Sequence, residues 1–259
     1  MKRPSTFLIL AMVASLPGLV FGRLTLATNL EPQRIFFGQA KSVSVVIQNP
    51  GDQSFAGELR TRIFQTSTAS GVLLSDNSWR LFQIPAGETV LSSATLDFPT
   101  VKAETRFIVQ WLTNTNFVIG ETMVLVYPTN LLAELKPLAG DEPLGVFDPN
   151  NRLKPLLKNL QVAFADLENS DLENFSGRLA IIGPFSARAQ MRAGLAAQIK
   201  ALAKKGTAIV WLQPPPEKCD KLSPSFYSVP ENTNAVVIVQ PELVANLSEN
   251  PQSQLNLIY

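Results

Sequence analysis

Apolar and polar residues alternate in short runs through the first half of the chain, from Leu24 to about Tyr127. In one such run Val43, Val45 and Ile47 stand at every second position. Because neighbouring side chains of a strand point to opposite faces, this alternation predicts half-buried strands of an antiparallel sheet. Seven strands are predicted, near residues 24–28, 42–48, 56–65, 79–84, 88–97, 104–113 and 117–127. Seven short strands at this spacing predict an all-β sandwich of two sheets.

The pattern changes after Pro128. Short apolar runs follow, several without alternation, as is typical of strands that are covered on both faces. They lie at residues 144–148, 161–166, 179–183, 207–213 and 235–240. Helical patterns lie between them, and a repeated strand-helix-strand order predicts a parallel sheet with right-handed crossovers. Five such strands predict an α/β domain of the flavodoxin-like class.

Two helical patterns occur between these runs. A stripe of leucines repeats at helical spacing in residues 153–160. A longer helix is predicted for residues 187–205, with Ser186 as its N-cap and Gly206 just beyond its last turn. A serine hydroxyl accepts a hydrogen bond from the first helical turn, and glycine readily takes the left-handed conformation that ends a helix.

The first 22 residues have the order of parts of a secretory signal peptide. Lys2 and Arg3 precede an apolar run, and Gly22 offers a small residue for cleavage. The run is shorter than the roughly 20 apolar residues that a membrane-spanning helix needs. We therefore expect an exported protein, periplasmic, at the cell surface or secreted, without membrane insertion after cleavage. The expected division is 1–22 signal peptide, 23–129 β-sandwich, 130–142 linker and 143–259 α/β domain.

Composition excludes several classes of function. Loss of Lys2 and Arg3 leaves 20 basic and 21 acidic residues, so the formal net charge changes from +1 to −1. A nearly neutral chain without basic clusters lacks the charge that nucleic-acid binding requires, so no nucleic-acid partner is expected. The chain contains no histidine, which excludes Ser-His-Asp and Cys-His catalysis and histidine metal ligands. Its single cysteine cannot form an intrachain disulfide.

Two segments resemble known families. The segment Phe82–Glu88, Phe-Gln-Ile-Pro-Ala-Gly-Glu, resembles a turn of the immunoglobulin-like modules attached to secreted glycosidases and adhesins. Residues 145–148, 178–184 and 202–210 together resemble class I glutamine amidotransferase-like domains, over about residues 140–245. These domains also occur without amidotransferase activity in secreted glycosidases and exported proteins. The resemblances imply an immunoglobulin-like sandwich followed by a flavodoxin-like domain.

The amidotransferase resemblance lacks the catalytic residues of that family. Active members place a cysteine on a tight, glycine-flanked turn directly after a strand, with a histidine base further along. The equivalent turn here falls near Gln213 or Pro214, and proline fixes a φ unsuited to that turn. Cys219 lies several residues beyond, and no histidine is present to take its proton. We therefore expect Cys219 to be an ordinary loop thiol rather than a nucleophile.

Polar residues follow several predicted strands, where open parallel sheets bind ligands. The candidates for ligand contact or chemistry are Asp148, Asn150, Asp166, Ser186 and Gln213. Asp148 and Asp166 together would suit acid-base chemistry or an oxygen site for Mg²⁺ or Ca²⁺. The alternative, which we favour, is that Asp148 caps the turn into the following helix and that Asp166, Glu168 and Asp171 belong to a solvated loop.

A cofactor site and a sugar site would need different residues in different halves of the chain. No glycine-rich phosphate loop is present, so no nucleotide or flavin cofactor is expected, and no resident metal is expected. In the first half Trp79, Trp111 and Phe117 are candidates for a sugar-stacking platform. The alternation of its strand predicts that Trp111 is in the core, whereas Trp79 follows a predicted turn at Asp76–Ser78 and is expected to be more exposed.

These observations predict a non-catalytic binding or scaffold protein that engages a partner protein or a glycan. The alternative is a carboxylate-dependent hydrolase, acting on carbohydrate, with its site at Asp148 and Asp166. A third interpretation, one subunit or fragment of a larger assembly, stays open because residues 254–259 end inside an apolar stretch, which indicates a final helix or strand docked against another surface.

Overall fold

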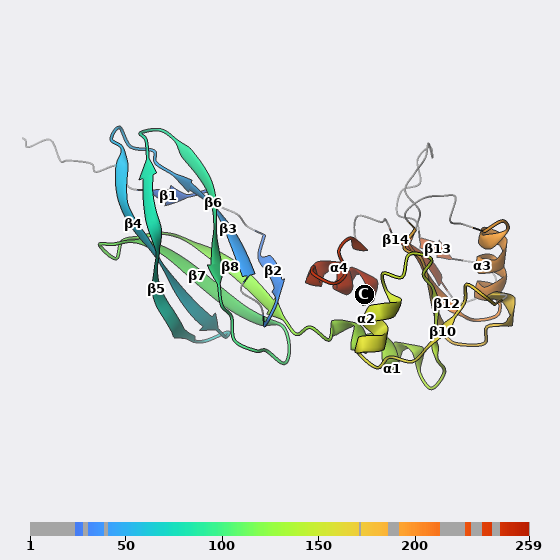
Figure 1. Cartoon of the computed structure of the whole chain (residues 1–259). Helices are drawn as coiled ribbons and strands as arrows, with labels where there is room; N and C mark the ends of the chain where they lie inside the picture. The colour runs from blue at the N-terminus through green and yellow to red at the C-terminus, as the bar shows by residue number, and fades with distance from the viewer. Residues whose placement is uncertain are drawn as a thin grey trace, which may run out of the picture.

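The computed structural model describes residues 24–27, 31–38, 41–170, 172–185, 192–212, 226–228, 235–239 and 244–258 (Figure 1). Within these ranges the chain is mostly β-structure, with two sheets in the first half, a largely parallel sheet in the second and few helices. The expected signal peptide, Ser186, Gln213 and Cys219 lie outside the described residues. No helix in the described ranges has the length and apolarity needed to cross a membrane.

The first half forms two sheets. The three-stranded sheet is antiparallel, in the order β1 (Thr25–Leu26), β3 (Lys41–Gln48) and β6 (Thr89–Leu96). The five-stranded sheet has the order β2 (Gln33–Phe36), β8 (Val118–Tyr127), β7 (Thr105–Thr113), β4 (Phe55–Thr66) and β5 (Gly71–Ile84). Its strands are antiparallel except that β2 runs parallel to β8.

The strand pattern differs from the expectation at two places. β2 was not predicted, because four residues between loops are too few to show a period. β5 begins at Gly71 rather than near residue 79, because Asp76–Ser78 continue the strand instead of forming a turn. A bulge in the β4–β5 pairing lies beside this segment, and a bulge shifts the alternation on which the sequence pattern depends.

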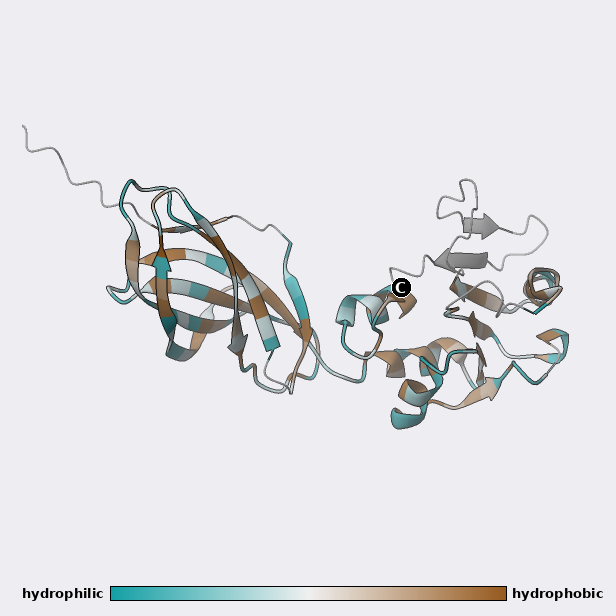
Figure 2. Ribbon diagram, turned by 45° about the horizontal axis from the view of Figure 1, so that its top comes forward, coloured by the Kyte–Doolittle hydropathy of each residue, from teal (hydrophilic) through white to brown (hydrophobic). Residues whose placement is uncertain are grey.

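The two sheets of the first half share one hydrophobic core. It contains Val43, Val45 and Ile47 from one sheet and Phe107, Val109 and Trp111 from the other. Apolar and polar residues alternate along the strands, as the colours of Figure 2 show. Trp111 is fully buried, as expected, and its indole N–H donates to the hydroxyl of Thr122 at 2.9 Å.

Thr122→Val is expected to lower the free energy of unfolding by about 1 to 2 kcal/mol, because it leaves the buried indole N–H of Trp111 without an acceptor. Denaturant unfolding followed by tryptophan fluorescence measures the effect. Thr122→Ser is the matched control, since it keeps the hydroxyl and should retain most of the stability. Equal stability of the valine and serine variants would show that this hydrogen bond contributes little.

The sheet of the second half has the order β10 (Phe164–Asp166), β9 (Leu144–Phe147), β11 (Leu179–Ile182), β12 (Ala208–Leu212), β14 (Ala235–Val239) and β13 (Phe226–Ser228). All of these pairs are parallel except β13 with β14. The five parallel strands follow the spatial order 2-1-3-4-5, and the unpredicted β13 extends one edge. The order reverses between β9 and β11, which makes the carboxyl ends of these two strands the favoured place for a ligand.

Both faces of this sheet are covered, which explains its continuous apolar runs. Val146 and Ile181 belong to a core with α2 (Lys154–Asn159), α4 (Pro251–Ile258) and the short helices η1 (Leu131–Glu134) and α1 (Leu135–Ala139). Phe147 and Ile182 point to the opposite face and pack with α3 (Leu195–Lys204) and the short helix η2 (Leu172–Asn174).

Two expectations for the helices are corrected by the structure. Residues 130–142, expected to form a linker, contain η1 and α1, and Leu132, Leu135 and Ala139 are buried in the core of the second half. The long helix begins at Leu195 rather than at residue 187, because Gly194 precedes it with a left-handed φ of 77° and residues 192–194 are not helical. Gly194 is the N-cap residue of α3, and Ser186, expected in that role, lies outside the described residues.

The two halves meet where α4 lies beside β2 (Figure 1). Phe36, Leu125 and Tyr127 form a small buried cluster against which Leu131 and Leu255 pack. The C-terminal helix thus contacts the first half with one face and the core of the second half with another.

Candidate functional site

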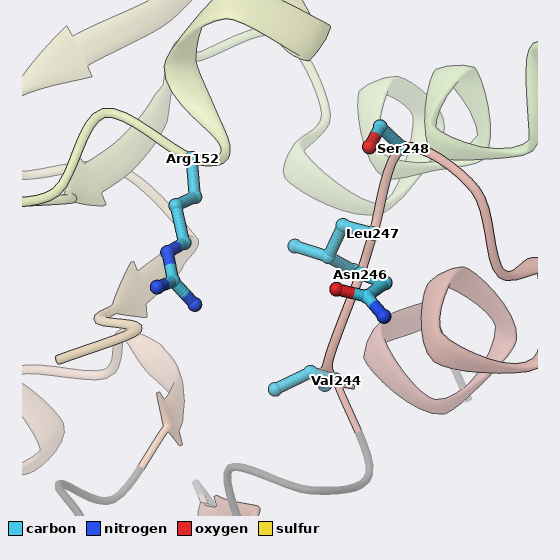
Figure 3. A pocket seen from close by; sticks show the side chains of 5 residues that line it. All are labelled: Arg152, Val244, Asn246, Leu247 and Ser248. Atoms are coloured by element: carbon cyan, nitrogen blue, oxygen red, sulfur yellow. The ribbon is translucent and has the colours of Figure 1, made fainter. Parts of the chain in front are cut away.

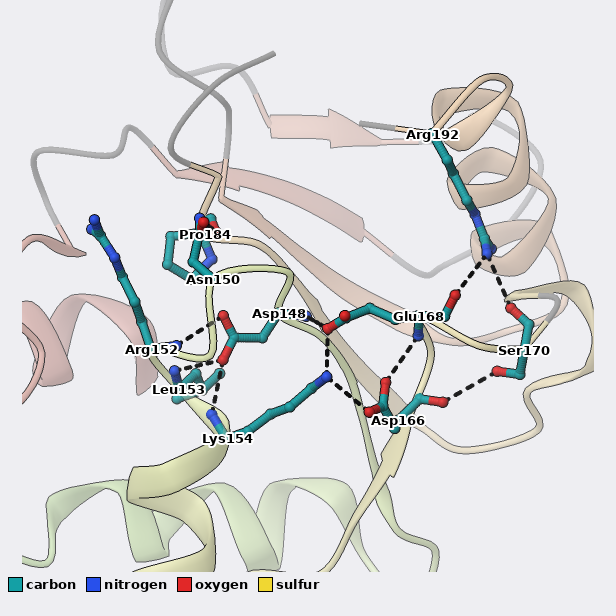
Figure 4. Close-up of polar contacts among 10 residues, drawn as sticks. All are labelled: Asp148, Asn150, Arg152, Leu153, Lys154, Asp166, Glu168, Ser170, Pro184 and Arg192. Carbon is teal, nitrogen blue, oxygen red and sulfur yellow. Dashed lines mark hydrogen bonds and ion pairs between the residues drawn. The ribbon is translucent and has the colours of Figure 1, made fainter. Parts of the chain in front are cut away.

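Asp148 follows β9 at the edge where the strand order reverses, and its side chain is fully buried. One carboxylate oxygen, Oδ1, accepts the backbone N–H of Arg152 at 3.1 Å. The other, Oδ2, accepts those of Leu153 at 2.7 Å and Lys154 at 2.9 Å (Figure 4). These N–H groups belong to the start of α2, where they lack partners within the helix. Asp148 therefore serves as the acceptor that fixes the β9–α2 loop.

Asp166, the last residue of β10, is linked to the same loop through Lys154. The Lys154 amine is buried and donates to Asp166 Oδ2 at 2.8 Å and to Glu168 Oε1 (Figure 4). Glu168 Oε1 also accepts the backbone N–H of Asp148 at 2.9 Å. One buried cation thus pairs with two carboxylates from the neighbouring strand end and balances the charge of one of them.

The pKa values of this group follow from the contacts. Burial lowers the pKa of Lys154, but the hydrogen bonds and attraction of Asp166 and Glu168 outweigh burial and raise it above its ordinary value. The hydrogen bond from Lys154 lowers the pKa of Asp166, against a smaller opposing effect of burial. At neutral pH both groups are therefore charged, and Asp166 holds no proton to donate as a general acid.

The remaining strand-end contacts hold the loops together. Asn150 donates from Nδ2 to the carbonyl of Pro184 at 2.8 Å, which joins the loop after β9 to the loop after β11 (Figure 4). Gly183 has φ 102°, and a Cβ there would lie 2.7 Å from the carbonyl oxygen of Leu212. Arg192 donates to the carbonyl of Ser170 at 3.2 Å, and its guanidinium lies 5.5 Å from the ring centre of Phe147.

The donor set does not suit a metal ion. Among the described residues, no group of three or more His, Cys, Asp or Glu side chains is placed to hold one. Asp148 already accepts three backbone N–H groups, and Asp166 is paired with Lys154. Asp148 and Asp166 both contact Lys154, one through its backbone N–H and the other through its amine, so each carboxylate is committed to a contact within the protein.

A cavity of about 290 Å³ lies beside this region (Figure 3). It is lined by Arg152, Val244, Asn246, Leu247 and Ser248. The Arg152 backbone is fixed by Asp148, whereas its side chain is exposed and makes no ion pair with a described residue. Asn151 and Asn246 take left-handed backbone conformations, with φ 51° and 54°. Such conformations gather at binding loops more often than elsewhere.

Sequence reasoning named Asn150 in this loop but missed Arg152 and Lys154. The available signal was the Asn-Asn-Arg run that begins three residues after the end of the buried strand β9, which places a cation in the strand-end loop. The segment that supplies Val244–Ser248 carried no such signal, because it forms a turn between β14 and α4 without a regular period.

Trp79 lies differently from the expectation. It stands at a bulge within β5, is half-buried and packs on the core, with its ring centre 4.8 Å from that of Trp111. The guanidinium of Arg80 lies 5.6 Å from its ring centre. Trp79 and the fully buried Trp111 therefore do not form an open platform for a sugar ring.

Comparisons with known proteins do not place the chain in a family. No family model matches the chain, and no curated protein matches it. Matching structures include an alkylpurine DNA glycosylase from Pseudomonas fluorescens, with 15% identity and a TM-score of 0.31 over 40% of this chain and 30% of that chain. A β-glucosidase from Listeria innocua matches with 16% identity and a TM-score of 0.29 over 40% of this chain and 16% of that chain. Both matches span less than a third of the other protein, and at these TM-scores they support no statement about function.

Proposed function

We propose that this chain is an exported, non-catalytic binding protein that engages a partner protein or a glycan at the cell surface or in the periplasm. In this proposal an immunoglobulin-like sandwich precedes a flavodoxin-like, amidotransferase-like domain that has lost its catalytic residues. The strand order 2-1-3-4-5 is that of flavodoxin-like sheets and supports the second part of this description.

The engagement of the strand-end carboxylates is the observation that carries the proposal. A general acid or base must be able to exchange a proton with a substrate. Asp148 is fully buried and bound to three backbone N–H groups, and Asp166 is held by a buried lysine that keeps it charged. The chain has no histidine, and both carboxylates at the described strand ends are engaged within the protein. These observations support a binding or scaffold role rather than catalysis.

The same contacts count against the alternative, a hydrolase that uses Asp148 and Asp166. A glycosidase needs one carboxylic acid with a raised pKa and a second carboxylate across the scissile bond. Here the pKa of Asp166 is lowered, and Asp148 points its oxygens at the start of α2. A cavity lined by Arg152 lies beside these residues, and Arg152 makes no ion pair with a described residue, which supports the binding of an anionic group there.

Binding assays on residues 23–259 test the proposal. We expect saturable binding to a glycan array, or specific capture of a protein from the exported fraction of the host, together with no hydrolysis of glutamine or of aryl glycosides. Clean negatives from both binding assays would contradict a binding role. Turnover that is lost in Asp166→Asn, with the fold retained, would instead establish the hydrolase.

A further inference from the structure

We propose that the cavity at Arg152 binds the free C-terminal carboxylate of a partner protein whose last residue is aliphatic. This inference rests on the proposed binding function and names the partner chemistry of its strand-end cavity. The cavity, of about 290 Å³, is large enough for the end of an extended peptide rather than for a folded surface.

Arg152 is the charged residue among the described residues that line the cavity. The nearby acids are engaged elsewhere: Asp148 by backbone N–H groups, and Asp166 and Glu168 by Lys154. Arg152 therefore contributes a guanidinium that no described carboxylate neutralises. A guanidinium offers a planar fork of donors that matches a carboxylate with two parallel hydrogen bonds, so an anion of this shape is the complementary ligand.

The other lining residues suit the rest of a peptide end. In Figure 3 the Arg152 side chain extends toward Val244, Asn246 and Leu247 across the cavity. Asn246 and Ser248 are exposed, and their side chains can donate to and accept from a peptide backbone. Val244 and Leu247 are largely buried and form a small apolar floor that suits a short aliphatic side chain.

The described lining favours a peptide over an acidic sugar. Sugar rings are commonly held on the face of an aromatic side chain, and none of the five described lining residues is aromatic. Arg152 is also held in place from its backbone, because Asp148 accepts its N–H at 3.1 Å.

The test uses an array of five-residue peptides that carry each of the twenty residues at the C-terminus, every peptide in free-acid and amidated form, with residues 23–259 as the binding protein. We expect binding to acids that end in Val, Leu, Ile or Ala, and at least about tenfold weaker binding to the amidated twins, because amidation removes a charge-assisted hydrogen-bond acceptor. The comparison of acid with amide needs no variant.

Arg152→Gln is expected to weaken binding of the best acid by about tenfold or more, and Arg152→Lys by less, because lysine keeps the charge but loses the fork. Arg106→Gln removes an exposed cation from β7, outside the cavity lining, and should bind like the parent. Circular dichroism and thermal unfolding check that each variant is folded.

The outcomes separate this inference from the proposed function. Equal binding of acids and amides, or unchanged binding by Arg152→Gln, would overturn the carboxylate site. Binding of an acidic glycan that depends on Arg152, without binding of any peptide acid, would also overturn the peptide inference while leaving the binding function standing. Capture of a partner protein that does not depend on Arg152 would likewise overturn the peptide inference and leave the binding function standing. Failure of every binding assay would contradict both proposals.

Discussion

Asp148→Ala is expected to lower the free energy of unfolding by about 3 to 4 kcal/mol, because it leaves three backbone N–H groups at the start of α2 without their acceptor. Asp148 is fully buried, so water does not readily replace the carboxylate. Loss of a single exposed helix cap costs about 1 kcal/mol, and the larger value here reflects burial and the number of donors. Urea unfolding followed by circular dichroism measures the difference.

Two further variants test whether the loss of stability in Asp148→Ala comes from the missing acceptor. Asp148→Asn keeps one oxygen acceptor and should lose about 1 to 2 kcal/mol, between the parent and the alanine variant. Asp97→Ala removes an exposed carboxylate in the first half and should change stability by less than about 0.5 kcal/mol. A stability of Asp148→Ala within that same margin would show that the carboxylate is not structural, and it would become available again for chemistry.

Much of the sheet structure was predictable because each half has a clear environment. In the first half one face of each sheet is in the core, so apolar residues such as Val43 and Val45 recur at every second position. In the second half both faces are covered, so the runs at β9 and β11 are continuously apolar. The period of the pattern therefore reported which faces of each strand are buried.

The C-terminal helix α4 shows why the type of an element could stay open, since a final helix or strand was expected there. Its buried residues include Ser253 and Gln254, so its buried face is not a hydrophobic stripe. These polar side chains are accommodated by local acceptors: Ser253 donates to the carbonyl of Ala245, and Gln254 donates to that of Leu247 at 2.7 Å. These hydrogen bonds depend on the turn that contains Ala245 and Leu247, which no pattern in the sequence predicts. The remaining signal was Pro251, which suits the first turn of a helix.

The candidate site was predictable in location but not in chemistry. A strand followed by Asp148, and another ending at Asp166, placed both acids at one edge of a parallel sheet. Whether such an acid is reactive depends on its partners, and these come from the next helix rather than from the strands. Lys154 would ordinarily be expected on a solvent-facing surface, yet its amine is buried between Asp166 and Glu168. The buried lysine thus engages both carboxylates within the protein, which the sequence pattern did not indicate.

Lys154→Met is expected to lower the free energy of unfolding by about 3 kcal/mol at pH 7, because it leaves two neighbouring carboxylates without their shared cation. Methionine has a similar length and packs where the lysine stem lies, so the loss reports the charge rather than a cavity. This loss of unfolding free energy lies at the low end of the range for breaking a buried ion pair, because the Asp166 side chain is 43% exposed and partly hydrated. Lys158→Met, an exposed position on the same helix, should change stability by less than about 0.5 kcal/mol.

The pH dependence of that difference distinguishes an ion pair from a packing effect. The pKa of Asp166 is lowered from 3.8, so its contribution is present above that value and is lost as the pH falls through the lower pKa of the folded state. The pKa of Lys154 is raised from 10.5, so its contribution is present below that value and is lost as the pH rises through the higher pKa of the folded state. The stability gap between parent and Lys154→Met should therefore be widest and nearly constant from about pH 5 to 9, and it should narrow at both extremes. If this stability difference were the same at about pH 3 as at pH 7, the loss in Lys154→Met would come from poorer packing of the methionine. The ion pairs of Lys154 would then not be its cause.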